Sequence, residues 1–348
     1  MVKPDFERSL IENLQPVRYF ALAQALHHSM DLGIFAAVDA SPGLGEAELA
    51  GKLGLDPERL RALLRYLQNE GYLVREDGWS LTPKGAGLPL FAPWYELLVG
   101  GYATTFQQLG EVLHEGAPWG TRDATRVGAG SCGISAYDAL PLVERLLDAS
   151  GRELTTVVDM GCGDAAFLVD LLLRRRELRG VGLEPNLTST ELGTARARAA
   201  GVADRLELHH GPAAEVTALD LPEEGRGTCF LTAFVLQEIL EQAGESAVED
   251  FLRRTFKSHP EALWIVIEVD HQPTAPTMAH GLAMAYYNPY YLIHAITEQR
   301  LETARYWTDL FDRAGLQCLA IGYPDDRVDS TGLEFGCLLS AAGEEGMT

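Results

Sequence analysis

Seven short apolar runs alternate with helical segments between residues 151 and 348, and this alternation limits the possible folds more than any other feature. The runs are TTVVDM, GVGLEP, LELHHG, TCFLTAFV, LWIVIEVD, QCLAIGY and EFGCLLSA. Stretches with helical periodicity separate them, such as AAFLVDLLLRRREL and SAVEDFLRRTF. Strands that alternate with helices predict an α/β domain with a mostly parallel, doubly wound sheet over 151–348.

The first 90 residues have a different pattern. Apolar residues recur at helical spacing over 9–38, and two short amphipathic helices follow over 45–54 and 56–71. Asp56 is expected to cap the second of these, with Pro57 in its first turn. The run YLVREDGWSLTP then alternates about an Asp-Gly pair, which predicts a β-hairpin. Two helices followed by a hairpin indicate a winged-helix-like domain over 1–90.

This N-terminal domain allows two interpretations. Arg59, Arg61 and Arg65 lie on its second short helix, where they could contact DNA. However, residues 1–90 contain nine basic and twelve acidic residues. The long apolar helix is suited to burying one face against a second copy of the chain. We therefore expect dimerisation and a role in covering the substrate, and we expect a homodimer.

Residues 91–150 form a segment between the two domains. We expect it to be a linker, helical in part, that contributes to a substrate pocket. Its Gly-rich part, 116–141, is expected to be irregular, because long irregular segments inside compact chains are usually functional.

The stretch VVDMGCGD carries the most information about a ligand. A strand is expected to end at Asp159 and to lead into a tight turn with Gly161 and Gly163, where the missing Cβ atoms allow close approach to a ligand. Glu184 ends the next expected strand and is placed to accept hydrogen bonds from ribose hydroxyls. A carboxylate directly before the turn would repel a pyrophosphate but would suit a ligand with an ammonium and a sulfonium group. We therefore expect S-adenosylmethionine rather than a dinucleotide such as NAD.

Other residues are expected at the same edge of the sheet, because ligands bind outside the carboxyl ends of parallel strands. Gly211 and Ala213 should border the adenine, and Tyr137 the transferred methyl group. The remaining residues expected to line the pocket or its rim are Phe234, Gln237, Glu238, Asp270 and His271.

The order of these segments, followed by RLETARYWTDLFDRAGL, resembles the winged-helix O-methyltransferase superfamily, whose catalytic domain has a Rossmann-like class I fold. Within it, the chain is similar to the S-adenosylmethionine-dependent 2-oxo acid C3-methyltransferases. That resemblance rests on APWYELLVGGY, GAPWGTRDATRVGAGSCGISAYDALPL, GLAMAYYNPYYLIHAITEQRLE and DSTGLEFGCLL. It implies methylation of the carbon next to the ketone of a small 2-oxo acid, in β-methyl amino acid or antibiotic biosynthesis.

The resemblance also implies residue roles. Trp94 would pack against the substrate, and Arg122 would pair with its carboxylate. Tyr287 and Tyr291 would line the pocket. His294 would be a ligand of a divalent metal such as iron or zinc, which would bind the 2-oxo acid and stabilise its enolate. With glutamine at 237, the other groups that could hold the metal are Glu238, Asp270 and His271.

Gln237 departs from this pattern, because the family has a histidine there. An amide cannot act as a base and is a weak metal ligand, so the metal is held by other groups, or the site works without a tightly bound metal, or the chemistry has changed. Glu238 is the first choice for the base that removes the C3 proton, and His271 the second. The alternatives are an O-methyltransferase of a small aromatic hydroxyl compound, another S-adenosylmethionine-dependent reaction, and a regulator that senses S-adenosylmethionine.

Charge and cysteine content limit the partners and the location. The net charge is −22, which disfavours nucleic acids and anionic membrane surfaces as partners. Five scattered cysteines without a CxxC pair are typical of reduced thiols in the cytoplasm. No secretion signal or long apolar span is recognisable.

Overall fold

The computed structural model describes residues 5–342, and these separate into two compact units that divide between Gly100 and Gly101. The expected intermediate segment, 91–150, is thus divided between them. Among residues 5–342, none of the helices combines the length and hydrophobicity that a membrane crossing requires.

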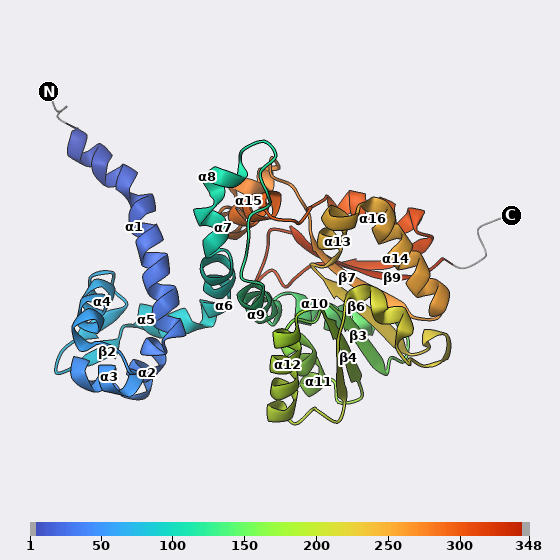
Figure 1. Ribbon diagram of the computed structural model, residues 1–348, viewed down its shortest axis with the longest axis horizontal. Coiled ribbons are helices and arrows are strands. Elements are labelled where there is room, and N and C mark those ends of the chain that lie inside the picture. The colour runs from blue at the N-terminus through green and yellow to red at the C-terminus, as the bar shows by residue number, and fades with distance from the viewer. Residues whose placement is uncertain (1–4, 343–348) are drawn as a thin grey trace. The chain divides into compact units, whose positions relative to one another are not determined.

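The first unit is mainly helical (Figure 1). Its elements are α1 (Phe6–Asp31), α2 (Ile34–Ala40), α3 (Glu46–Leu53), α4 (Pro57–Asn69), β1 (Leu73–Arg75), β2 (Trp79–Leu81), α5 (Pro83–Gly87), α6 (Ala92–Tyr95), the 3-10 turn η1 (Leu88–Phe91) and the π-helical turn η2 (Glu96–Gly101). Strands β1 and β2 pair antiparallel, which confirms the expected hairpin. Asp56 caps α4 by accepting hydrogen bonds from the backbone N–H groups of Glu58 and Arg59, 3.1 and 2.8 Å away.

The second unit is a three-layer α/β domain. Its strands are β3 (Thr156–Met160), β4 (Arg179–Glu184), β5 (Leu206–His210), β6 (Thr228–Ala233), β7 (Leu263–Val269), β8 (Leu316–Gly322) and β9 (Glu334–Ala341). They form one sheet in the order β5-β4-β3-β6-β7-β9-β8, in which only β9 runs antiparallel to its neighbours β7 and β8. All seven expected strands are confirmed. Because the order reverses between β3 and β6, a ligand crevice is expected at their carboxyl ends.

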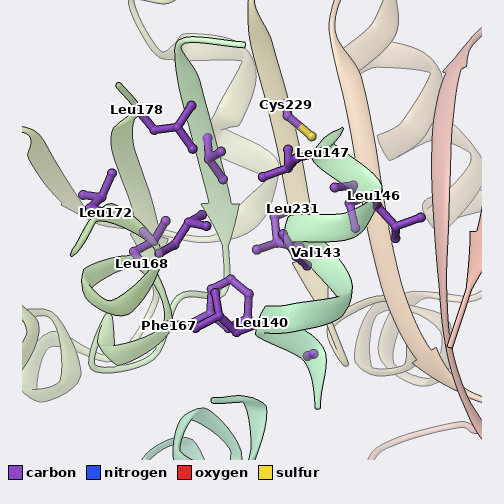
Figure 2. Close-up of a cluster of buried hydrophobic side chains, with 14 of the residues drawn as sticks. Leu140, Val143, Leu146, Leu147, Phe167, Leu168, Leu172, Leu178, Cys229 and Leu231 are labelled. Carbon is purple, nitrogen blue, oxygen red and sulfur yellow. The ribbon is translucent and has the colours of Figure 1, made fainter. Parts of the chain in front are cut away.

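Helices cover both faces of this sheet (Figure 1). One face carries α10 (Ala139–Ala149), α11 (Ala166–Arg174) and α12 (Leu187–Ala200), and the other carries α13 (Leu236–Ala243), α14 (Glu245–Ser258) and α16 (Ala304–Arg313). Figure 2 shows Leu147 and Val143 of α10 beside Cys229 and Leu231 of β6, and Leu168 and Leu172 of α11 farther along the same cluster. This packing fixes the strand ends from which the candidate site is built.

The remaining helices of this unit are α7 (Ala103–Gln107), α8 (Leu109–Val112), α9 (Ala124–Ser135) and α15 (Asn288–Ile296). Short turns complete it: η3 (Ala213–Ala218), η4 (Glu223–Gly225), η5 (Pro276–Ala279) and the π-helical η6 (Ala283–Tyr287).

The irregular structure expected for 116–141 is wrong for most of that segment, because α9 and the start of α10 occupy it. The Asp123 side chain accepts a hydrogen bond from the backbone N–H of Arg126, 3.0 Å away, and caps α9. A Cβ on Gly101 would lie 2.7 Å from Cγ2 of Val127, so the glycine allows α9 to pack closely. Capping and packing therefore outweigh the low helix propensity of the glycines.

Candidate active site

The glycine turn lies at the carboxyl end of β3, as expected. Gly161 and Gly163 both have positive φ, +97° and +56°. A Cβ on Gly161 would lie 2.7 Å from Cγ2 of Val235, so the turn requires glycine there. The backbone N–H of Gly163 donates to Oε2 of Glu184, 2.9 Å away. The turn and the acidic residue that ends β4 are therefore brought together.

Two buried carboxyl groups flank this turn. Burial, reinforced by the nearby Glu184, raises the pKa of Asp159 to about 7. Burial also raises the pKa of Glu184, although the N–H groups of Gly163 and Asn186 donate to its two oxygens. Two carboxyl groups with raised pKa values would gain from a positively charged ligand and would repel a pyrophosphate.

The other expected cofactor residues lie on neighbouring elements. The backbone N–H of Gly211 donates to the carbonyl O of Glu184, 3.1 Å away, and Ala213 begins η3. Phe234 follows β6 with φ +60°, a strained backbone for a residue with a side chain. Tyr137 lies between α9 and α10 and is exposed.

Cys132 is a neighbour of the turn that the sequence analysis missed. Its Sγ lies 3.2 Å from the position that a Cβ on Gly163 would occupy. The charges of Asp164 and Asp159 add to burial in raising the pKa of this thiol, which places it beside both acids. Nothing in the sequence around α9 indicated this contact.

Arg122 lies in a second polar cluster. Its Nη2 lies 2.6 Å from Oε1 of Glu238, and its Nη1 lies 3.5 Å from the hydroxyl of Tyr102. Gln299 donates to the same Glu238 oxygen, 2.8 Å away, and accepts a hydrogen bond from Tyr102. Arg122 and Glu238 were both expected in the site. Tyr102 and Gln299 were not, because no local motif marks either residue.

Gln237 and His294 are both buried in this region. The Oε1 atom of Gln237 has no hydrogen-bond partner within the described residues. The His294 ring stacks on Tyr290 at a centroid distance of 3.8 Å, and its Nδ1 lies 2.7 Å from the Tyr290 carbonyl O, to which it must donate. Burial lowers the pKa of His294 to about 3, so its imidazole is neutral.

These residues do not fit a resident divalent metal. Glu238 is paired with the Arg122 guanidinium, and the charge of Arg122 also acts on His294. The neutral His294 imidazole is the form that binds metals, but its neighbours are an amide oxygen and a carboxylate already paired with a guanidinium, which is a poor ligand set for a divalent cation. In the described part of the chain, the only group of three acidic, histidine or cysteine ligands close enough to share an ion is His27, His28 and Asp31 on α1.

Three further expected residues, His271, Tyr287 and Tyr291, have partners of their own. His271 packs edge-on against the ring of Tyr291, 4.9 Å between centroids, and burial lowers its pKa. The hydroxyl of Tyr291 donates to the Asp270 carbonyl O, 2.8 Å away, and that of Tyr287 donates to Asp329. Trp94 lies on α6 in the first unit, where its ring contacts Phe91.

The comparisons with known proteins cover both units of the chain. No protein-family model matches the chain. It is 44% identical to 2-ketoarginine methyltransferase of Streptomyces arginensis over 340 residues, which cover 96% of this chain and 97% of that protein.

Solved structures show the same fold at low identity. Human N-acetylserotonin methyltransferase in complex with S-adenosylmethionine matches 99% of this chain and 100% of its own, with a TM-score of 0.68 and 15% identity. Mitomycin 7-O-methyltransferase matches 97% and 99%, with a TM-score of 0.65 and 18% identity. The chain is therefore an S-adenosylmethionine-dependent methyltransferase with a class I fold and an N-terminal helical domain, and it belongs to the family of 2-ketoarginine methyltransferase.

Proposed function

We propose that this enzyme transfers the methyl group of S-adenosylmethionine to C3 of a small 2-oxo acid. The name of the relative that is 44% identical supports a 2-oxo acid as substrate. The observation that carries the proposal is the contact between Arg122 and Glu238, 2.6 Å apart. This contact puts the Arg122 guanidinium, which can hold the substrate carboxylate, next to the Glu238 carboxylate, which can remove a proton from the substrate.

Arg122 would bind the substrate carboxylate. A planar guanidinium can donate two parallel hydrogen bonds to a carboxylate, which lysine cannot do. Substrate binding would replace Glu238 as the partner of Arg122. A remaining N–H of Arg122 would then face the 2-oxo oxygen, where negative charge develops as the C3 proton leaves.

Glu238 would be the base. It lies in the first turn of α13, and Gln299 donates to its Oε1, 2.8 Å away, so its orientation is kept when Arg122 changes partner. The C3–H bond breaks, its proton goes to Glu238, and its electron pair forms the enolate. The enolate carbon then attacks the methyl group, the sulfur–carbon bond breaks, and S-adenosylhomocysteine leaves as a neutral thioether.

We further propose that this step uses no resident metal, since the ligands around Glu238 and His294 do not suit one. We also propose that the enzyme acts as a cytoplasmic homodimer without nucleic-acid or membrane partners. Its product, a 3-methyl-2-oxo acid, would serve β-methyl amino acid or antibiotic biosynthesis after transamination.

Mass spectrometry of product mixtures tests the reaction. The enzyme is incubated with S-adenosylmethionine and 4-methyl-2-oxopentanoate, phenylpyruvate or 5-guanidino-2-oxopentanoate, with and without EDTA. We expect a product one methyl group heavier, in equal amounts with and without the chelator. Arg122→Lys should lower kcat/KM by about a hundredfold, because a bidentate charged contact is lost.

Arg226→Lys is the matched control, since Arg226 forms an exposed ion pair with Glu261. It should leave turnover unchanged. If none of the three 2-oxo acids is methylated, the proposed reaction is wrong. A tenfold loss in EDTA that added iron or zinc restores would contradict only the metal-free step.

A further inference from the structure

Three carboxyl groups that the proposed mechanism does not use lie buried together in the second unit. They belong to Asp138, Asp329 and Glu334, which are 5%, 6% and 2% exposed. Asp138 and Glu334 share a hydrogen bond between their side chains. Within residues 5–342, no Lys, Arg or His forms an ion pair with any of the three. Such an arrangement is costly unless a cation completes it.

One atom of this acidic cluster has no partner. Oε1 of Glu334 is buried and forms no hydrogen bond within the described residues. By contrast, Oδ1 of Asp138 accepts from the Ala139 N–H, 2.5 Å away, and Asp329 accepts from Thr331 and from the Tyr287 hydroxyl. Burial raises the pKa of Asp138 to about 7 and that of Glu334 well above its ordinary value. The cluster therefore has acceptor capacity that the protein leaves unused.

The cluster lies at the edge of the sheet where ligands of this fold bind. Glu334 is the first residue of β9 and pairs with Val269, the last residue of β7. Because β9 runs antiparallel to β7, its beginning lies at the carboxyl ends of the parallel strands.

A row of aromatic rings connects the acidic cluster with Arg122. The rings belong, in order, to Tyr287, Tyr286, Tyr290, His294 and Tyr102, with successive centroids 5.1, 5.7, 3.8 and 6.1 Å apart. The row begins at the hydroxyl that donates to Asp329 and ends at the hydroxyl next to Arg122. One end thus carries a positive charge, the other carries carboxyl groups, and rings lie between them.

We propose that Asp138, Asp329 and Glu334 bind a guanidinium group at the far end of the substrate chain and so determine which 2-oxo acid is methylated. This inference rests on the proposed function, in which Arg122 holds the substrate carboxylate. The acids and Arg122 then select a substrate with opposite charges at its two ends. The planar guanidinium presents five N–H donors, which suits several carboxyl oxygens better than the three donors of an ammonium group.

Binding measurements with a matched pair of 2-oxo acids test the site. 5-Guanidino-2-oxopentanoate and 5-ureido-2-oxopentanoate have nearly the same shape, but only the first is cationic. Calorimetry in the presence of S-adenosylhomocysteine should give an affinity about tenfold to a hundredfold higher for the guanidino acid, because hydrogen bonds to charged groups are lost in the ureido acid. Glu334→Gln and Asp329→Asn should each reduce this preference to threefold or less.

Asp326→Asn, an exposed carboxylate on the same loop, should keep the full preference. Thermal unfolding checks that each variant is folded. If Glu334→Gln does not fold, the preference measured for Asp329→Asn decides the test. Equal affinities in the wild-type enzyme, no binding of either acid, or a preference that persists in the folded cluster variants would overturn the inference. Methyl transfer to 4-methyl-2-oxopentanoate, measured separately, would in that case leave the proposed function standing. If the guanidino acid binds preferentially but no 2-oxo acid is methylated, the proposed function is refuted and the guanidinium site still stands.

Discussion

Asp159 shows how one buried residue can link cofactor binding to pH. Its pKa of about 7 in the free protein means that much of it is protonated at neutral pH. A cationic ligand favours the carboxylate, so binding of S-adenosylmethionine lowers the pKa of Asp159 and releases a proton. Affinity should therefore rise with pH, by up to about tenfold per unit below pH 7, and level off above it.

Asp159→Asn should remove this part of the pH dependence. Calorimetry at pH 6, 7 and 8 would measure it, with Asp204→Asn, an exposed surface change, as the control. The slope of affinity against pH differs between the wild type and Asp159→Asn only by the contribution of Asp159. The comparison therefore separates this contribution from those of Glu184 and of the amino group of the ligand. Equal slopes for the two proteins would mean that Asp159 does not face the cofactor.

At the residue scale, the sequence predicted contacts within one motif better than contacts across the fold. Gly163 and Glu184 were both expected at the same edge of the sheet, and they meet there because the ends of adjacent parallel strands lie side by side. Tyr102 and Gln299 were missed although they hold the Arg122 cluster together. They lie 197 positions apart, and no periodicity or spacing connects residues that meet only through tertiary packing.

At the scale of elements, α13 depends on a buried acid from another strand. Oε1 of Glu268, on β7, accepts from the Leu236 N–H at the start of α13, 3.1 Å away, while its Oε2 has no partner within the described residues. Burial raises the pKa of Glu268 to about 8. The helix that carries Gln237 and Glu238 is therefore held by a carboxyl group that is mostly protonated at neutral pH.

This raised pKa predicts a loss of stability as pH increases. Between about pH 5 and pH 8 the unfolded chain has an ionised Glu268 and the folded protein a protonated one, so the free energy of unfolding falls by about 1.4 kcal/mol per pH unit from this group. Glu268→Gln should reduce the slope by about 1 kcal/mol per unit, as measured by urea unfolding at pH 6, 7 and 8. Parallel slopes for the variant and the wild type would show that Glu268 is ionised in the folded protein.

Elements with strong local signals were predictable, and one without them was not. The strand–helix alternation gave all seven strands, and the Asp-Gly pair gave the hairpin. Helix α9 was missed because glycines at 128, 130 and 133 hide its periodicity. Its stability comes from the Asp123 cap and from close packing, and only the cap could have been recognised in the sequence.

At the scale of the whole molecule, α1 has an exposed apolar stripe that suggests assembly. Phe6, Leu10, Leu14, Val17 and Phe20 are 44–66% exposed and recur at intervals of three or four residues, so they share one side of the helix. An exposed apolar stripe of this length is typical of an interaction surface. It supports the proposed homodimer.

Breaking the stripe should separate the proposed dimer into monomers. Leu10→Glu combined with Leu14→Glu places four charges in a symmetric interface. At roughly 2 kcal/mol for each buried leucine, the dissociation constant should rise by several orders of magnitude. Sedimentation equilibrium would then give about half the wild-type mass, whereas Arg8→Glu, on the opposite side of α1, should leave the mass unchanged. A wild-type protein that sediments as a monomer, or a double variant that remains dimeric, would exclude this stripe as the dimer interface.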